Sequence, residues 1–240
     1  VTGLLDLAGN PIASTGNRVG FTSQYHILLV TADPGPLTFA GDQAVLQRLQ
    51  ARGFDVTLTT GTAVPNDGST ANGQDLVIVT SSLGSGTVIA TAGGAKFLRS
   101  PVPVIVWESA LEDDFNFQAA GGATTDAQTQ INIVNASHQL AAGFPAGLLT
   151  VTTSPQTFSQ GTPVGAHIVA TLAADPSLAL LYYFEKGEKG LNGFVMPARR
   201  VFFFFQDNTP AAVNAAGTKL FDAAVDFAMA VQPNGSTNAP

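Results

Sequence analysis

The stretch "YHILLVTAD" (Tyr25–Asp33) decides the fold class of this chain. Its middle is a nearly continuous run of apolar, partly β-branched residues, which is typical of a strand buried on both faces. The next stretch, "GDQAVLQRLQARG", places Val45, Leu46 and Leu49 on one helical face, and Gly53 ends the helix. A buried strand followed at once by an amphipathic helix predicts a parallel α/β sheet.

The alternation of strands and helices continues through the first half of the chain. Strands are predicted at "FDVTLTT" (Phe54–Thr60), "DLVIVTSS" (Asp75–Ser82) and "VPVIVWES" (Val102–Ser109), and a helix is predicted at "TVIATAGGAKFLRS" (87–100). Strands that are apolar throughout pair in parallel and bury both faces under helices. The first half therefore predicts a parallel sheet with a helical layer on each side.

The second half predicts antiparallel additions to this sheet and a closing helix. The segments "GLLTVTT", "HIVATLA", "LALLYYFEKG" and "GFVMPARRVFFFFQ" look like added strands. Within the last of them, "VFFFF" (Val201–Phe205) is predicted to be central, because an apolar edge strand invites aggregation. The predicted fold class is α/β, a flavodoxin-like three-layer sandwich with a mostly parallel central sheet, over residues 25–231. Its last helix, Asn214–Val231, is expected to bury Leu220, Phe221, Ala224, Val225, Phe227 and Ala228.

Charge and cysteine content exclude several kinds of partner and site. Charged residues make up 11% of the 240 residues, the net charge is −7, and there is no cysteine. Nucleic-acid binding needs Lys and Arg that this chain lacks, so no nucleic-acid partner is expected. No apolar run reaches the ~18 residues that span a bilayer, so no membrane insertion is expected. Disulfides and thiolate sites are excluded, and the Thr- and Gly-rich composition predicts an extracellular or cell-surface location.

The first 23 residues, "VTGLLDLAGNPIASTGNRVGFTS", resemble the last two strands of bacterial Ig-like modules of the surface-layer type. The resemblance rests on a D-x-x-G-N-P turn at Asp6–Pro11 and on the strand end Phe21–Ser23. It implies that residues 1–24 are a β-hairpin appendage left from an Ig-like sandwich. Such strands need backbone partners, so the expected partner is a second copy of this chain, by strand addition, or an adjoining domain. Residues 232–240 have the composition of a linker.

Residues 25–231 resemble the class I glutamine amidotransferase-like fold, nearest its trehalose-utilisation-type branch. The similar stretches are "HILLVTAD", "SHQLAAGF" (Ser137–Phe144) and "RRVFFFFQDN". In that family a cysteine nucleophile stands on a turn after a central strand, where this chain has Glu108 or Ser109. The family's histidine follows a late strand, where this chain has Gln206–Asn208. The resemblance therefore implies a scaffold without amidotransferase chemistry, which argues against an enzyme.

The densest acidic cluster, Glu108, Glu112, Asp113 and Asp114, follows a strand, where open α/β sheets place their ligands. If the next turn is helical, Glu108 and Glu112 share one face and could hold Ca²⁺ or Mg²⁺ or act as an acid–base pair. The alternative is a helix start whose acids complement the helix dipole. Trp107 is positioned to stack on a sugar. The catalytic candidates are Glu108, Ser109, Asp113 and Asp114, and the ligand-binding candidates are Trp107, Glu108 and Glu112. No cofactor is expected, and calcium at this cluster is the alternative.

Other motifs carry weaker signals. "SSLGSGT" (Ser81–Thr87) follows a strand, but it lacks the third glycine and the lysine of phosphate-binding loops, which favours a plain turn. The three histidines have no metal-ligand spacing; His26 is predicted to be buried in a strand, and His138 to begin a turn. A Ser–His–acid triad using Ser109 stays an alternative, although no G-x-S-x-G elbow surrounds it.

Two functions are consistent with these patterns. The first is a non-catalytic extracellular structural or interaction module of a larger bacterial or archaeal surface protein or assembly, self-associating through its N-terminal strands. The alternative is a secreted carbohydrate-active hydrolase, or a carbohydrate-binding module, that uses the acidic cleft at Glu108–Asp114.

Overall fold

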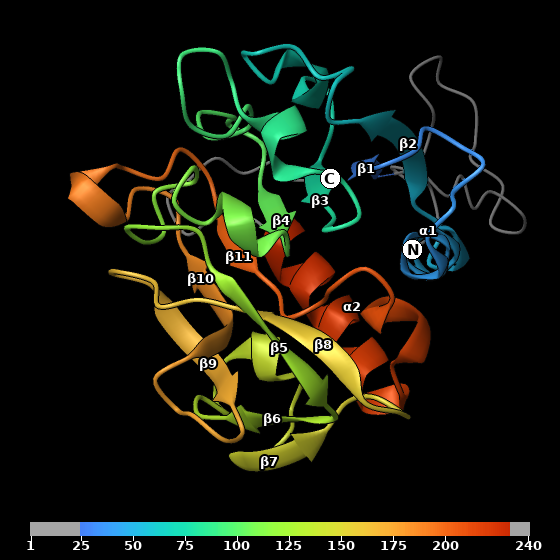
Figure 1. The fold of residues 1–240 in the computed structure, drawn as a ribbon, viewed down its shortest axis with the longest axis vertical. Coiled ribbons are helices and arrows are strands. Elements are labelled where there is room, and N and C mark those ends of the chain that lie inside the picture. The colour runs from blue at the N-terminus through green and yellow to red at the C-terminus, as the bar shows by residue number, and fades with distance from the viewer. Residues whose placement is uncertain (1–24, 231–240) are drawn as a thin grey trace, which may run out of the picture.

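The computed structural model describes residues 25–230, which form a mixed α/β domain (Figure 1). The helices are α1 (Ala40–Ala51) and α2 (Ala215–Met229). The strands are β1 (His26–Thr31), β2 (Asp55–Thr60), β3 (Leu76–Val79), β4 (Val104–Val106), β5 (Ala123–Gln128), β6 (Gln130–Ile133), β7 (Gly147–Thr150), β8 (Gln156–Gln160), β9 (His167–Leu172), β10 (Ala179–Phe184) and β11 (Arg200–Phe202).

Nine of these strands form one sheet in the order β2-β1-β3-β4-β11-β10-β9-β6-β7. The strands from β2 to β11 in this order run parallel, whereas β10, β9, β6 and β7 pair in antiparallel fashion. Strands β5 and β8 make a separate antiparallel ribbon, the β5–β8 ribbon. The α/β prediction, with a mostly parallel sheet and antiparallel additions in the second half, is confirmed.

Strand β11 lies between β4 and β10, which confirms the central position predicted for "VFFFF". Val201 to Phe205 are all buried at 1% exposure or less. The segment closes the parallel half of the sheet and starts the antiparallel half, so both halves share one strand.

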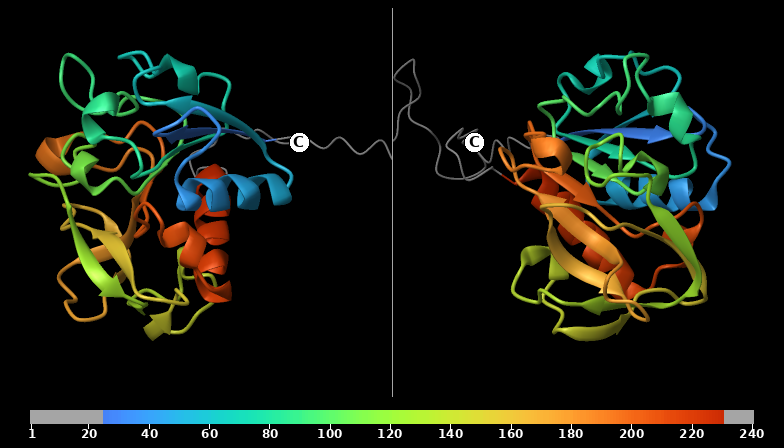
Figure 2. Two further views of the ribbon diagram at one scale, coloured as in Figure 1. Left: turned by 45° about the vertical axis from the view of Figure 1, so that its right-hand side comes forward. Right: turned by 60° about the vertical axis from the view of Figure 1, so that its left-hand side comes forward.

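The two faces of the sheet are covered differently. Alternate residues of the parallel strands point to opposite faces, and α1 and α2 both pack on the face that contains Ile27, Leu29 and Ile105. Figure 2 shows both helices on the same side of the sheet. The opposite face, with Leu28 and Val30, is covered by loops and short 3-10 turns instead of α-helix, so the predicted helical layer on this side is wrong.

The predicted helix at 87–100 is wrong and belongs to this irregular layer. The chain makes only a 3-10 turn at Ser85–Val88 and then an isolated antiparallel bridge between Ile89 and Ala95. Gly93 and Gly94 have φ angles of +88° and +76°, which an α-helix does not accommodate. The two glycines therefore turn the chain back on itself.

Both predicted helices at the two ends of the domain are confirmed. Helix α1 ends where Gly53 adopts a φ of +86°. The side chain of Asn214 caps α2 by accepting hydrogen bonds from the N–H groups of Ala216 and Gly217. All six residues predicted to face the core from α2 are buried.

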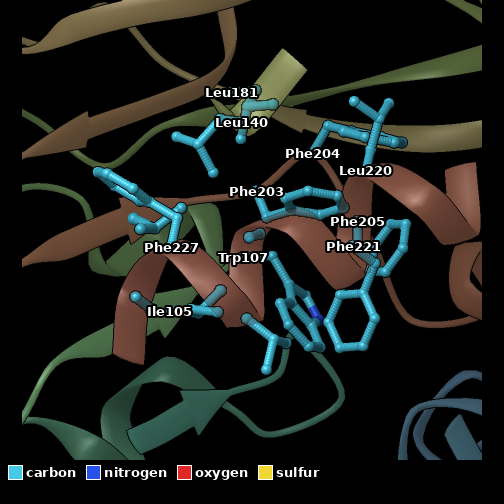
Figure 3. Close-up of a cluster of buried hydrophobic side chains, with 14 of the residues drawn as sticks. Ile105, Trp107, Leu140, Leu181, Phe203, Phe204, Phe205, Leu220, Phe221 and Phe227 are labelled. Atoms are coloured by element: carbon cyan, nitrogen blue, oxygen red, sulfur yellow. The ribbon is translucent and has the colours of Figure 1, made fainter. Parts of the chain in front are cut away.

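Aromatic residues fill the space between α2 and the sheet (Figure 3). Trp107, which follows β4, packs edge-to-face on Phe205 and Phe221, with ring centroids 5.6 and 6.3 Å apart. Such pairs add to the free energy gained by burying their area. The core therefore ties β4, β11 and α2 together directly beneath the carboxyl ends of the parallel strands.

Residues 1–24 and 231–240 lie outside the described residues. The hairpin appendage, its strand-addition partner and the linker-like tail therefore stay predictions. Across residues 25–230, no helix is both long enough and apolar enough to cross a membrane.

Candidate functional site at the carboxyl edge of the parallel strands

The carboxyl ends of the parallel strands bring together four acidic side chains from distant parts of the sequence. Asp33 follows β1, Glu108 follows β4, Asp207 lies in the segment after β11, and Asp42 lies at the start of α1. The chain passes from β1 to β2 on one side and returns to β3 on the other, which makes β1 and β3 the switch point of the sheet. Open α/β sheets bind ligands in the crevice at this point.

Asp42 is the most buried of the four carboxylates. Its Oδ2 accepts a hydrogen bond of 2.5 Å from Ser82 Oγ, and Ser82 Oγ in turn accepts one of 3.1 Å from the N–H of Ala32. Burial raises the pKa of Asp42 to about 6, against the lowering effect of the Ser82 hydrogen bond, and the nearby Asp207 and Asp33 raise it further. Ser82 thus links the ends of β1 and β3 to the start of α1.

Glu108 stands at the end of β4 and begins the 3-10 turn Ser109–Leu111. Its Oε1 accepts a hydrogen bond of 3.0 Å from the N–H of Ala110. Burial raises the pKa of Glu108 to about 7, and Asp207 contributes to the rise through charge repulsion. Its φ and ψ of −74° and 100° are ordinary for an extended residue, so the strained geometry of a nucleophile elbow is absent at Glu108.

Asp207 is fixed by close packing of its backbone. A Cβ at Gly41 would lie 1.9 Å from the carbonyl oxygen of Asp207, so only glycine allows this contact between α1 and the segment after β11. Oδ1 of Asp207 is buried and has no hydrogen-bond partner in the described part of the chain. Asp207 also lines a polar recess of about 190 Å³, together with Gln156, Thr157, Gln206, Asn208 and Thr209.

Glu112 does not belong to this edge, which corrects the expected pairing of Glu108 with Glu112. Its side chain is 0% exposed, and its Oε2 accepts a hydrogen bond of 2.5 Å from the hydroxyl of Tyr182. Burial raises the pKa of Glu112 to about 8, and the nearby Asp113 adds to this effect. No group of three or more His, Cys, Asp or Glu side chains in residues 25–230 is arranged to hold a metal ion, and calcium at the acidic cluster stays a prediction.

The other predicted candidates are dispersed. Trp107 is 1% exposed and packed in the core, which overturns its expected role in stacking on a sugar. Ser109 is buried, and its carbonyl oxygen accepts hydrogen bonds from the N–H groups of Glu112 and Gly122. Asp113 is exposed, and Asp114 is half-buried, with a pKa raised by burial and by Asp113. Of the predicted residues, the structure places Glu108 alone among the acids of the carboxyl edge.

The sequence reasoning missed Asp33 and Ser82 as site residues and gave Asp42 and Asp207 no chemical role. Three of these residues follow a buried strand within a few positions, and Asp42 lies at the start of the first helix. A polar residue in either position is the sequence pattern that could have indicated them. Of the two histidine predictions, one is confirmed, because His138 begins a 3-10 turn. The predicted burial of His26 is wrong: its side chain is exposed and contacts Asp55.

No protein-family model matches the chain, and no curated protein matches its sequence. Among solved structures it is similar to a protein from Bacteroides uniformis described as ThuA-like, with a TM-score of 0.57 and 8% identity over 92% of this chain and 98% of that chain. A ThuA-like protein from Parabacteroides merdae has a TM-score of 0.49 and 12% identity over 90% and 93%. A glutamine amidotransferase from Thermotoga maritima has a TM-score of 0.47 and 9% identity over 87% and 99%.

The predicted role as a non-catalytic structural module of a surface protein is wrong, because the fold is shared with a ThuA-like protein. The Ig-like resemblance and the carbohydrate-active alternative gain no support from the similar structures. The predicted extracellular location stays a prediction. At such low identity the likeness establishes the fold alone: the chain has an amidotransferase-like, ThuA-like α/β fold.

Proposed function

We propose that the chain is an acid–base enzyme in which Glu108 transfers protons at the carboxyl edge of the parallel strands. The observation that carries this proposal is the position of Glu108 directly after β4 and near Asp207, where burial and charge repulsion raise its pKa to about 7. A carboxyl group with a pKa near the working pH is present in both protonation states, so it can donate a proton in one step and accept one in another. Ordinary surface glutamates lack this property.

The positions of Glu108 and Asp207 support the same proposal. Under the amidotransferase resemblance, Glu108 or Ser109 stands where the family has its cysteine, and the stretch Gln206–Asn208, which includes Asp207, stands where it has its histidine. The two residues follow β4 and β11, which are neighbouring parallel strands. Without a thiol no thioester forms, so proton transfer replaces covalent catalysis in this proposal. We also propose that the chain is related to the trehalose-utilisation-type branch of this fold, and the ThuA-like fold supports this.

The charges of the site favour a neutral or cationic substrate. Asp33, Asp42, Glu108 and Asp207 create a negative field that repels anions. The recess beside Asp207 is lined by amide and hydroxyl side chains, among them Gln156, Thr157 and Asn208, which suit a polar uncharged molecule. We therefore assign the substrate to small, neutral, polar molecules.

The test is a pH-rate profile between pH 5 and 9 on a panel of neutral chromogenic p-nitrophenyl esters, amides and acetals. We expect turnover of at least one class, an inflection near pH 7, and a loss of about 100-fold in kcat for Glu108→Gln. Asp113→Asn, an exposed neighbour, is the matched control and should keep wild-type activity. The proposal fails if Glu108→Gln retains full activity, or if no compound is turned over and carbon-13 NMR shows Glu108 titrating near 4.5.

A further inference from the structure

A cavity of about 310 Å³ lies where α1, α2 and the segment after β11 meet, on the helix-covered face of the sheet. Its buried lining residues are apolar, and they include Val45 from α1, Phe205 from the segment after β11 and Phe221 from α2. The rings of Phe205 and Phe221 stack with their centroids 5.7 Å apart (Figure 3). Small-molecule sites in proteins are typically concave and apolar, with a few polar groups that orient the ligand. This cavity has the size and the lining for an apolar ring.

Three polar side chains also line the cavity, and each keeps a hydrogen-bonding group for a ligand. Arg48 donates from Nε and Nη2 to the carboxylate of Asp222, which leaves Nη1 without a partner in the described chain. The side chain of Gln47 is exposed and makes no hydrogen bond within the same residues. Thr218 Oγ1 donates its hydrogen to the carbonyl of Asn214 at 3.0 Å, so toward a ligand it can only accept. The cavity thus offers donors at Arg48 and Gln47 and an acceptor at Thr218.

The charges beside the cavity compensate each other. Asp222 pairs with Arg48, and its Oδ1 lies 3.5 Å from Arg52 Nη1, while Arg52 also pairs with Asp226. An anionic ligand next to Arg48 would face the carboxylate of Asp222, and a cationic ligand would face the guanidinium of Arg48 itself. Like charges at short range are unfavourable. The cavity therefore favours an uncharged ligand.

We propose that this cavity binds a small, uncharged aromatic molecule with an amide-like head group. The ring packs against Phe205 and Phe221, because aromatic pairs gain more than the burial of their area. The head group presents its carbonyl oxygen to Arg48 and an N–H group to Thr218 Oγ1, since an amide carries both an acceptor and donors. The site shares no lining residue with the recess beside Asp207, so it does not depend on the acid–base function.

Trp107 provides a signal for binding at this place. It is the single tryptophan of the chain, and its ring packs edge-to-face on both Phe205 and Phe221 (Figure 3). Those two phenylalanines line the cavity, whereas Trp107 lies behind them in the core. A ligand that packs against the two rings therefore changes the surroundings of Trp107, and its fluorescence reports the binding.

The experiment is titration of the full chain at pH 7 with benzamide, benzoate and benzamidinium, followed by calorimetry and by Trp107 fluorescence. The three probes share one ring and nearly one shape, but they are neutral, anionic and cationic, respectively. We expect benzamide to bind about tenfold more tightly than either charged probe. The Kd from fluorescence should equal the Kd from calorimetry.

Two pairs of variants on α1 place the ligand in the cavity. Ala44 is half-buried and lines the cavity, so Ala44→Phe should fill it and abolish binding. Ala51→Phe makes the same change at an exposed position of the same helix and should leave the Kd unchanged. Arg48→Met removes the donors and should weaken binding of benzamide about tenfold. Arg52→Met is its matched control, because Arg52 also contacts Asp222 but does not line the cavity.

Circular dichroism confirms that each variant is folded, and Arg48→Met keeps the test decisive if Ala44→Phe does not fold. Glu108→Gln should leave the Kd for benzamide unchanged, and a large change would place the ligand at the carboxyl edge instead. The proposal is overturned by that result, by the absence of benzamide binding, or by a charged probe that binds as tightly as benzamide. It is also overturned if folded Ala44→Phe or Arg48→Met binds benzamide like the wild type.

Discussion

Glu108 and Glu112 are four residues apart, yet they stand in two different environments. Glu108 lies at the open edge of the parallel strands beside Asp207, whereas Glu112 lies under the β5–β8 ribbon against Tyr182. Four residues in an α-helix return to nearly the same face, but four residues at about three per turn end about 120° away. The 3-10 turn at Ser109–Leu111 therefore directs the two carboxyl groups to separate sites.

The largest difference between the two glutamates should appear in the pH dependence of stability. The pKa of Glu112 is raised from 4.5 to about 8 in the folded state, so the folded chain binds more protons than the unfolded chain in this range. The stability that protonated Glu112 contributes to the folded state is fully present below pH 4.5 and is lost as pH rises through about 8. We expect the free energy of unfolding to fall on the order of 4 kcal/mol across this window.

Urea unfolding at half-unit steps of pH measures this loss. Glu112→Gln should flatten the profile up to pH 8, whereas Glu108→Gln should remove a smaller component that ends near pH 7, where Glu108 titrates. Identical stability profiles for the two variants would contradict the claim that Glu108 and Glu112 lie in different environments.

The next largest effect is expected at Gly161, one of the two glycines that pack against the Glu112 carboxyl group. In Gly161→Ala the new Cβ would lie 1.8 Å from Glu112 Oε2, so the carboxyl group or the β5–β8 ribbon must move. We expect a loss of about 3 kcal/mol in the free energy of unfolding, measured by urea denaturation.

A matched glycine and a double variant test the cause. Gly84 has an ordinary φ of −70°, and no atom lies within 4 Å of the position that a Cβ would take there, so Gly84→Ala should change stability by less than about 0.5 kcal/mol. Because the clash is with Glu112, adding Gly161→Ala to Glu112→Ala should cost much less than in the wild type. Full additivity would show that the ribbon backbone, and not the glutamate, opposes the larger residue.

The smallest predicted effect concerns the contribution of Asp207 to the pKa of Glu108. Asp207 raises the pKa of Glu108 through repulsion, as a contribution secondary to burial. Asp207→Asn should therefore lower the pKa of Glu108 by less than one unit, about 1 kcal/mol or below. Carbon-13 NMR of the glutamate carboxyl groups measures this shift, and an unchanged or raised pKa would contradict the pairing of the two residues.

The parallel half of the sheet was predictable because its strands are apolar on both faces. The sequence of Leu76–Val79 requires burial on two sides wherever it pairs, and α2 has an apolar face long enough to be recognised alone. Strands β5 and β8 are mostly polar and have no such pattern, and they form a ribbon separate from the nine-stranded sheet. Their positions depend on tertiary contacts.

The site was predictable only in part, for a related reason. Glu108 follows a buried strand and therefore had to reach the carboxyl edge. Trp107, one residue earlier, points to the opposite side and enters the core between β4 and α2. The burial of Glu112 depends on glycines 10 and 49 residues further along the chain, and no local pattern contains that information.

The central position of β11 has a consequence for the order in which the molecule is built. Strand β11 pairs with β4, whose partner residues lie 96 positions earlier in the chain, and the segment after β11 supplies Asp207. Pairings over such long separations form slowly because loop closure precedes any gain in contacts. During synthesis from the N-terminus, β1 to β4 emerge well before β11 does. The edge of β4 therefore stays open until about residue 200 has left the ribosome, and the acids of the carboxyl edge come together in the last stage of folding.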